Sequence, residues 1–138
     1  MVAMVASASA CAQGERAREV TVIGTDYRFQ MPATMPAGRT LLAFENRGRV
    51  DHEMIISRLK PGITLQQALE AQRRGADAAE FTDEGAGVLF ADAMRASAGK
   101  LLVDLAPGRS YVVICMFRDG QQAPAHAEMG MVASFTAQ

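Results

Sequence analysis

The feature that most constrains this 138-residue chain is a succession of short apolar segments separated by proline, glycine and asparagine. Most of these segments alternate apolar and polar residues, which is typical of half-buried strands. Turn pairs such as Pro61-Gly62 and Pro107-Gly108 divide them. Strands are predicted at 19–24, 27–31, 40–46, 52–59, 100–105, 109–117 and 130–136. Many short strands with turn residues between them predict a β-sandwich and argue against alternating strands and helices.

One segment has a helical pattern. Thr64 and Gln67 have the spacing of a capping box, and apolar residues follow at helical intervals, so a helix is predicted from Leu65 to about 74. Residues 76–99 are rich in alanine, glycine and aspartate, with weak periodicity, which predicts a loop that leaves room for short elements around Phe90 to Met94. With 49% apolar and 21% charged residues, the chain suits one globular domain, predicted over 19–138.

Candidate metal ligands gather near the end of the sequence. Cys115 closes an apolar run, and His126 and Met131 follow it, while His52 is the only other histidine. Cysteine, histidine and methionine are the soft and borderline ligands that favour copper. Each residue alone has a simpler explanation: buried cysteines and methionines are usually core residues, and His52 between two acidic residues could be an exposed, charge-paired histidine. The ordered combination is what indicates a metal site.

The same order resembles that of the cupredoxins, the family of blue copper proteins, over residues 19–138. The resemblance is carried by the segment 44–48, by His52 shortly after it, by the segment 105–115, and by the segment 125–131, in which four residues separate His126 from Met131. It implies an all-β Greek-key sandwich of about seven or eight strands with one short helix in a mid-chain excursion.

The resemblance also implies a function. One copper ion per chain would be bound by His52, Cys115 and His126, with Met131 as a weak axial ligand and Met129 as a less well-spaced alternative. Such a protein carries single electrons or copper and is not an enzyme. Its partner would be a redox protein or a copper-delivery protein.

The ten residues between Cys115 and His126 are a departure from the short loop typical of blue copper proteins. Asp119-Gly120 is a strong signal for a two-residue hairpin turn. A hairpin at that turn would set Cys115 opposite Pro124 and place His126 diagonally across on the same face. The sequence therefore predicts that the site depends on the register of this hairpin.

Two other functions fit the same residues. A cupredoxin-like module without metal would bind a protein or small molecule, and a Cu(I) chaperone would use the methionines. A thiol nucleophile formed by Cys115 and His126 lacks any visible oxyanion-binding or orienting group. A net charge of −1 and the absence of tryptophan argue against nucleic acid as a partner.

The first twelve residues are uncharged, small and apolar, which resembles the end of a secretory signal with small residues at the cleavage site. Ala-Ser-Ala before Cys11 also resembles a bacterial lipobox, so Cys11 is a candidate lipid anchor. Either version predicts a protein exported to the periplasm or anchored outside the cytoplasm, with residues 13–18 as a linker. The alternatives are an alanine-rich terminus of a cytosolic protein, and a disulfide from Cys11 to Cys115.

Overall fold

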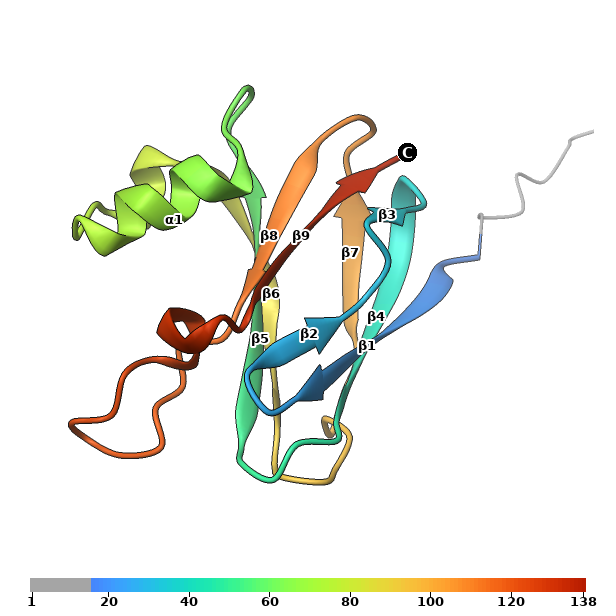
Figure 1. The fold of residues 1–138 in the computed structure, drawn as a ribbon. Helices are drawn as coiled ribbons and strands as arrows, with labels where there is room; N and C mark the ends of the chain where they lie inside the picture. Colours follow the sequence, from blue (N-terminus) through green and yellow to red (C-terminus); the bar gives the residue numbers. More distant parts are fainter. Residues whose placement is uncertain (1–15) are drawn as a thin grey trace, which may run out of the picture.

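The computed structural model describes residues 16–138, which form two β-sheets packed face to face (Figure 1). One sheet has the strand order β2-β1-β4-β7 and the other the order β3-β9-β8-β5-β6. The strands are β1 (Arg18–Thr25), β2 (Arg28–Gln30), β3 (Thr34–Met35), β4 (Gly38–Asn46), β5 (His52–Leu59), β6 (Thr82–Ala91), β7 (Leu101–Leu105), β8 (Ser110–Ile114) and β9 (Val132–Ala137). Neighbouring strands are mostly distant in sequence, as in a Greek-key sandwich. The predicted all-β sandwich is confirmed.

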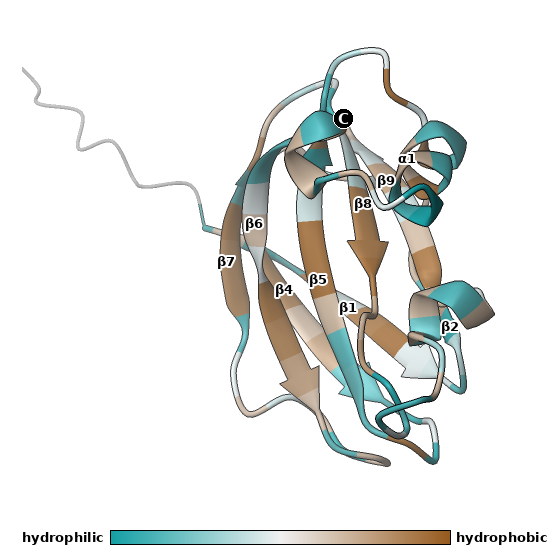
Figure 2. Ribbon diagram, turned by 90° about the vertical axis from the view of Figure 1, so that its left-hand side faces the viewer, coloured by the Kyte–Doolittle hydropathy of each residue, from teal (hydrophilic) through white to brown (hydrophobic). Residues whose placement is uncertain are grey.

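Alternation of side chains places one face of β4 and one face of β5 in the core between the two sheets. On β4, Leu42 and Phe44 point into the core, and on β5 Met54 and Ile56 do the same. Apolar stretches along β5, β7 and β8 are visible in Figure 2. Because successive side chains alternate between faces, the same period also places the polar residue Asn46 at the end of β4 and His52 at the start of β5 in the interior.

The single α-helix of the described chain, α1 (Leu65–Arg73), begins where the sequence predicts it. Thr64 Oγ1 accepts a hydrogen bond from the Gln67 amide at 3.2 Å, and Gln67 Oε1 accepts one from the Thr64 amide at 2.9 Å, so the capping box is formed. Ala68 and Ala71 are buried, and Ala68 packs with Leu59 in a small second core. Within residues 16–138, no helix has the length and apolarity needed to cross a membrane.

The predicted loop at 76–99 is wrong in its central part, which is strand β6. This strand lies at the edge of its sheet and pairs antiparallel with β5, with two register irregularities. Its sequence carries two acidic residues and two glycines and lacks alternation, so pattern alone could not identify it. Backbone pairing and an ion pair between Asp83 Oδ1 and Arg58 Nε at 2.7 Å hold it in place. A short 3-10 helix, Ala78–Glu80, precedes it.

The predicted strand at 109–117 is shorter in the structure, because β8 ends at Ile114. β9 pairs with β8 from Val132 onward, opposite Ile114. The segment between them is a loop that contains the 3-10 helix His126–Met129 (Figure 1, orange to red). The predicted signal sequence, the lipid anchor at Cys11 and the first part of the linker lie outside the described residues.

Candidate metal centre

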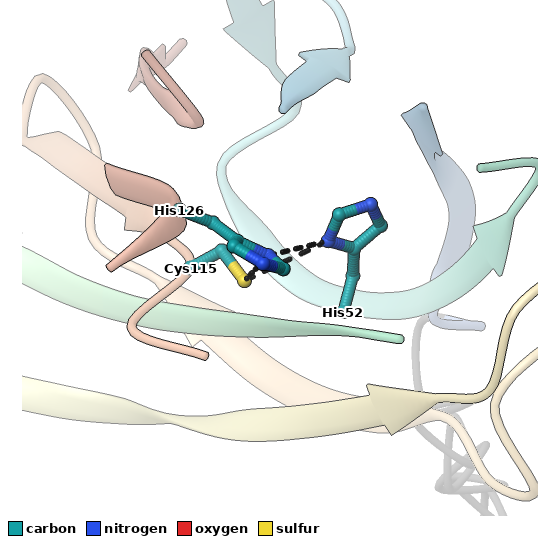
Figure 3. Close-up of side chains that lie close together, drawn as sticks. All are labelled: His52, Cys115 and His126. Atoms are coloured by element: carbon teal, nitrogen blue, oxygen red, sulfur yellow. Dashed lines mark hydrogen bonds between the residues drawn. The ribbon is translucent and has the colours of Figure 1, made fainter. Parts of the chain in front are cut away.

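Three of the predicted ligands converge at one end of the sandwich (Figure 3). His52, Cys115 and His126 are each fully buried, although their positions in the sequence span more than seventy residues. Their donor atoms lie 2.9 Å apart for His52 Nδ1 and His126 Nδ1, 3.5 Å for Cys115 Sγ and His126 Nδ1, and 3.9 Å for Cys115 Sγ and His52 Nδ1. Two imidazoles and one thiol therefore face a common point.

The size of this triangle can be compared with the reach of a metal ion. A circle through three atoms 2.9, 3.5 and 3.9 Å apart has a radius of about 2.0 Å. Metal–nitrogen and metal–sulfur bonds of borderline divalent ions in proteins are roughly 2.0–2.3 Å long. One ion could contact all three donors with little movement of the side chains. The residues present therefore fit a metal in both chemistry and size.

The sheet itself positions two of the three donors. β5 and β8 pair antiparallel with Ile55 opposite Ile114. Continuing this register by one residue sets Cys115 opposite Met54, so His52 is the diagonal neighbour of Cys115 on the same inner face. Diagonal neighbours are roughly 7–8 Å apart at Cα, close enough for their side chains to meet one ion.

The third donor is positioned by a loop, and the predicted hairpin at Asp119-Gly120 is wrong. No ladder pairs Cys115 with Pro124 in the described chain, because the partner of β8 is β9. Proline has no amide hydrogen for such a ladder, and the Asp119 side chain is bonded elsewhere. His126 nevertheless reaches the site from the first position of its 3-10 helix. The diagonal geometry expected for Cys115 and His126 is found instead between Cys115 and His52.

Backbone hydrogen bonds close this loop around Cys115. Its carbonyl accepts from the Ala127 amide at 2.8 Å, and its amide donates to the Met131 carbonyl at 3.2 Å. The His126 amide donates to the Phe117 carbonyl at 2.9 Å, and the Met131 amide donates to the His126 carbonyl at 3.0 Å. These bonds fix the backbone on both sides of His126, so its imidazole is held without a strand.

The two candidate axial methionines lie in different environments. Met131 is fully buried and its backbone contacts both Cys115 and His126. Met129 is 37% exposed to solvent. A thioether that is to contact a buried ion must itself lie in the interior, which favours Met131. The ligand roles of all four residues remain a prediction, which is developed below.

Burial sets the charge states of the donors. It lowers the pKa of His52 below its usual value, with the neighbouring His126 as the next cause, which favours the neutral imidazole. It raises the pKa of the Cys115 thiol, against the effect of the Glu53 amide, which donates to Cys115 Sγ at 3.4 Å. A metal that binds here must therefore displace the thiol proton.

Sequence reasoning missed the surroundings of His126. Asp119 Oδ1 lies 2.9 Å from His126 Nε2, and Asp119 Oδ2 accepts a hydrogen bond from the Tyr27 hydroxyl at 2.8 Å. These bonds, that of Tyr27 first, hold the pKa of Asp119 below its usual range. The sequence pattern predicts Asp119 as a turn residue and Tyr27 as part of a strand. No local pattern could have paired residues 92 positions apart in the sequence.

Comparison with known proteins identifies the fold. No protein-family model matches the chain, and no curated protein sequence matches it. Dithionite-reduced auracyanin from the photosynthetic bacterium Roseiflexus castenholzii superposes with a TM-score of 0.58 at 16% identity, over 88% of this chain and 98% of its own. Auracyanin A, a "blue" copper protein from Chloroflexus aurantiacus, gives 0.56 at 14%, over 89% and 100%. Reduced rusticyanin gives 0.50 at 16%, over 87% and 76%. The resemblance predicted from the sequence is thereby confirmed, and the chain has the cupredoxin fold.

Proposed function

We propose that this protein binds one copper ion through His52, Cys115 and His126, with Met131 as a weak axial ligand, and that it transfers single electrons. The observation that carries the proposal is the convergence of two imidazole nitrogens and one sulfur within 3.9 Å of one another in the interior of a cupredoxin fold. Two histidines, a cysteine and a distant thioether form the donor set of blue copper electron-transfer sites.

The protein's own structure suits one-electron transfer because the donors are held rigidly. His52 begins β5 and Cys115 directly follows β8, the strand that pairs with β5, and His126 is fixed by backbone hydrogen bonds on both sides. Cu(I) and Cu(II) differ by one electron, and a site that barely rearranges between them exchanges that electron readily. The Glu53 amide contacts the Cys115 sulfur, and a contact of this kind tunes the reduction potential.

The second ring nitrogen of His52, Nε2, also lies in a distinct environment. Nε2 is buried without a hydrogen-bond partner. Once Nδ1 binds a metal, the ring proton of a neutral imidazole must reside on Nε2. A Cβ atom on Gly48 would lie 3.0 Å from this nitrogen, 2.8 Å from Asp26 Oδ1 and 3.1 Å from Asn46 Oδ1. The absence of a side chain at Gly48 thus leaves free the space beside Nε2, which a Cβ atom would occupy.

The test is to add one equivalent of Cu(II) to purified metal-free protein and to record the visible spectrum and the bound copper. We expect an intense thiolate-to-copper charge-transfer band, which Cys115→Ser abolishes while the fold, followed by circular dichroism, persists. A colourless protein without stoichiometric copper would refute the proposal. Tight Cu(I) binding without a coloured oxidised form would assign copper carriage instead of electron transfer.

We further propose that the protein works outside the cytoplasm with a redox partner protein, either free after cleavage of its leader or anchored at Cys11. The composition of residues 1–12 is the support for this localisation. Intact-mass measurement of protein purified from a bacterial host distinguishes the versions. A mature chain that begins after the leader supports secretion, a diacylated Cys11 supports anchoring, and an unprocessed chain found in the cytosol contradicts both.

A further inference from the structure

His126 is enclosed on the side that faces away from the other donors. Its Nε2 atom lies 2.9 Å from Asp119 Oδ1, and its ring is fully buried although it belongs to a loop. The Tyr27 ring packs edge-on against it with centroids 5.0 Å apart, and the Phe117 ring lies at 5.7 Å. Solvent therefore does not reach the outer nitrogen of this imidazole, and a carboxylate takes the place of water.

Asp119 determines which nitrogen of His126 carries the proton. An ionised carboxylate can only accept hydrogen bonds, so the proton between Asp119 and His126 resides on Nε2. In the neutral imidazole, Nδ1 then presents its lone pair toward Cys115 and His52. This is the tautomer in which Nδ1 can bind a metal without first losing a proton.

Tyr27 holds Asp119 in this position at some conformational cost. The tyrosine lies in the turn between β1 and β2 with φ of 60°, one of two non-glycine residues of the described chain in the left-handed region. Such a conformation is unfavourable for a residue other than glycine and persists where the surroundings enforce it. From this turn its hydroxyl donates to Asp119 Oδ2, and its ring lies edge-on to both imidazoles.

The long segment between Cys115 and His126 delivers the carboxylate. Asp119 lies within it, and Arg118 braces the segment by donating to the Ala123 carbonyl at 2.6 Å. The insertion that separates this chain from a short-loop blue copper site thus has a structural consequence: it brings a negative charge to the outer nitrogen of His126.

We propose that Asp119 and Tyr27 are a positioning pair that fixes the tautomer of His126 and sets the reduction potential of the copper site. This inference rests on the proposed function. A carboxylate bonded to a ligand imidazole makes that imidazole a stronger donor, which favours the more positive oxidised ion and lowers the potential. The Tyr27 hydroxyl withdraws part of that negative charge, so it acts in the opposite direction.

The two variants therefore have opposite predicted effects. Asp119→Asn keeps the shape of the side chain and removes its charge, so the reduction potential rises and Cu(II) affinity falls roughly 10- to 100-fold. Tyr27→Phe leaves the carboxylate charge concentrated on His126, so the potential falls. Asp104→Asn is the matched control, because it removes the same charge from an exposed position on β7, and the potential should not change.

Redox titration of the copper-loaded proteins tests the potential, and nitrogen-15 NMR of the metal-free proteins tests the tautomer. Shifts of the reduction potential in opposite directions in Asp119→Asn and Tyr27→Phe support the proposal. So does a proton on Nε2 of His126 in the wild type that is lost in Asp119→Leu, a variant without any acceptor at that position. The proposal is overturned if both variants shift the reduction potential in the same direction or leave it unchanged. It is also overturned if the proton of His126 resides on Nδ1 in the wild type. If the wild type binds no copper, the proposed function fails, while the metal-free spectra still decide the role of Asp119.

Discussion

The Asn46 side chain offers the sharpest test of how the fold prepares the site. It is 1% exposed, and its Nδ2 atom donates to the carbonyls of Val50, Ala91 and Asp92 at 2.8–3.1 Å. Its Oδ1 atom accepts from the Gly48 amide at 2.8 Å. These bonds tie the turn that leads into β5 to the end of β6, so Asn46 holds the segment that delivers His52.

Replacing Asn46 with alanine removes these interactions and leaves their partners in the interior. The amide has two hydrogens for three carbonyls, so the loss amounts to about three hydrogen bonds at about 1 kcal/mol each. We therefore expect Asn46→Ala to lower the free energy of unfolding by about 3 kcal/mol. With a urea m-value of roughly 2 kcal/mol/M, the midpoint should fall by about 1.5 M.

The measurement is urea unfolding of the metal-free protein by circular dichroism, because bound metal would add its own stabilisation. Arg47→Ala is the matched control from the same turn. Its ion pair with Glu45, at 2.8 Å, is exposed and screened by solvent, so its loss should change the midpoint far less. A loss in Asn46→Ala as small as that of Arg47→Ala would refute the reasoning, because the buried network would then contribute nothing that a surface pair does not.

Three further predictions concern the site and its surroundings. Gly48→Ala should weaken Cu(II) binding about tenfold or more in a competition titration, because the added Cβ would lie 3.0 Å from His52 Nε2; unchanged affinity would contradict this. Met131→Leu should keep the charge-transfer band and raise the reduction potential, since a thioether that stabilises the oxidised ion is lost; an unchanged potential would exclude an axial role. Hydrogen bonds from Arg58 and Arg109 hold the pKa of Asp83 below its usual value. The ionised Asp83 therefore stabilises the fold above about pH 4, and this stabilisation is lost as the pH falls through the lowered pKa. Asp83→Asn should flatten the acid limb of a plot of stability against pH, and an unaltered limb would contradict this role of Asp83.

Local patterns predicted the parts of this fold that depend on local chemistry. Alternation located β1, β4 and β5, and apolar residues of these strands, such as Phe44 and Ile56, form the core. The capping box at Thr64 predicted the start of α1 because both of its hydrogen bonds form within four residues. The order of the donors along the chain likewise indicates the cupredoxin fold, because it needs no knowledge of contacts.

Features that depend on distant partners could not be predicted in this way. β6 has the composition of a loop and becomes a strand only because β5 offers it a backbone edge. The pairing of Tyr27 with Asp119 joins a turn near the start of the chain to a loop near its end. In both cases the determining contact joins residues that are far apart in the sequence, so no local sequence pattern could indicate it.

The absence of the predicted hairpin shows which strand pairing the site depends on. The sequence predicts that Cys115 and His126 lie close together only if a hairpin at Asp119-Gly120 has the right register. That prediction requires His126 to lie on a strand. In the structure, the register that matters is between β5 and β8, which sets Cys115 beside His52. His126 then needs only a loop closed at both ends, and the hydrogen bonds of Cys115 to Ala127 and Met131 supply that closure. Two donors fixed by a sheet and a third fixed by loop closure tolerate a spacer of any length that can form those bonds. The long spacer is therefore compatible with a copper site, and its added residues are free to do something else, as Asp119 does at His126.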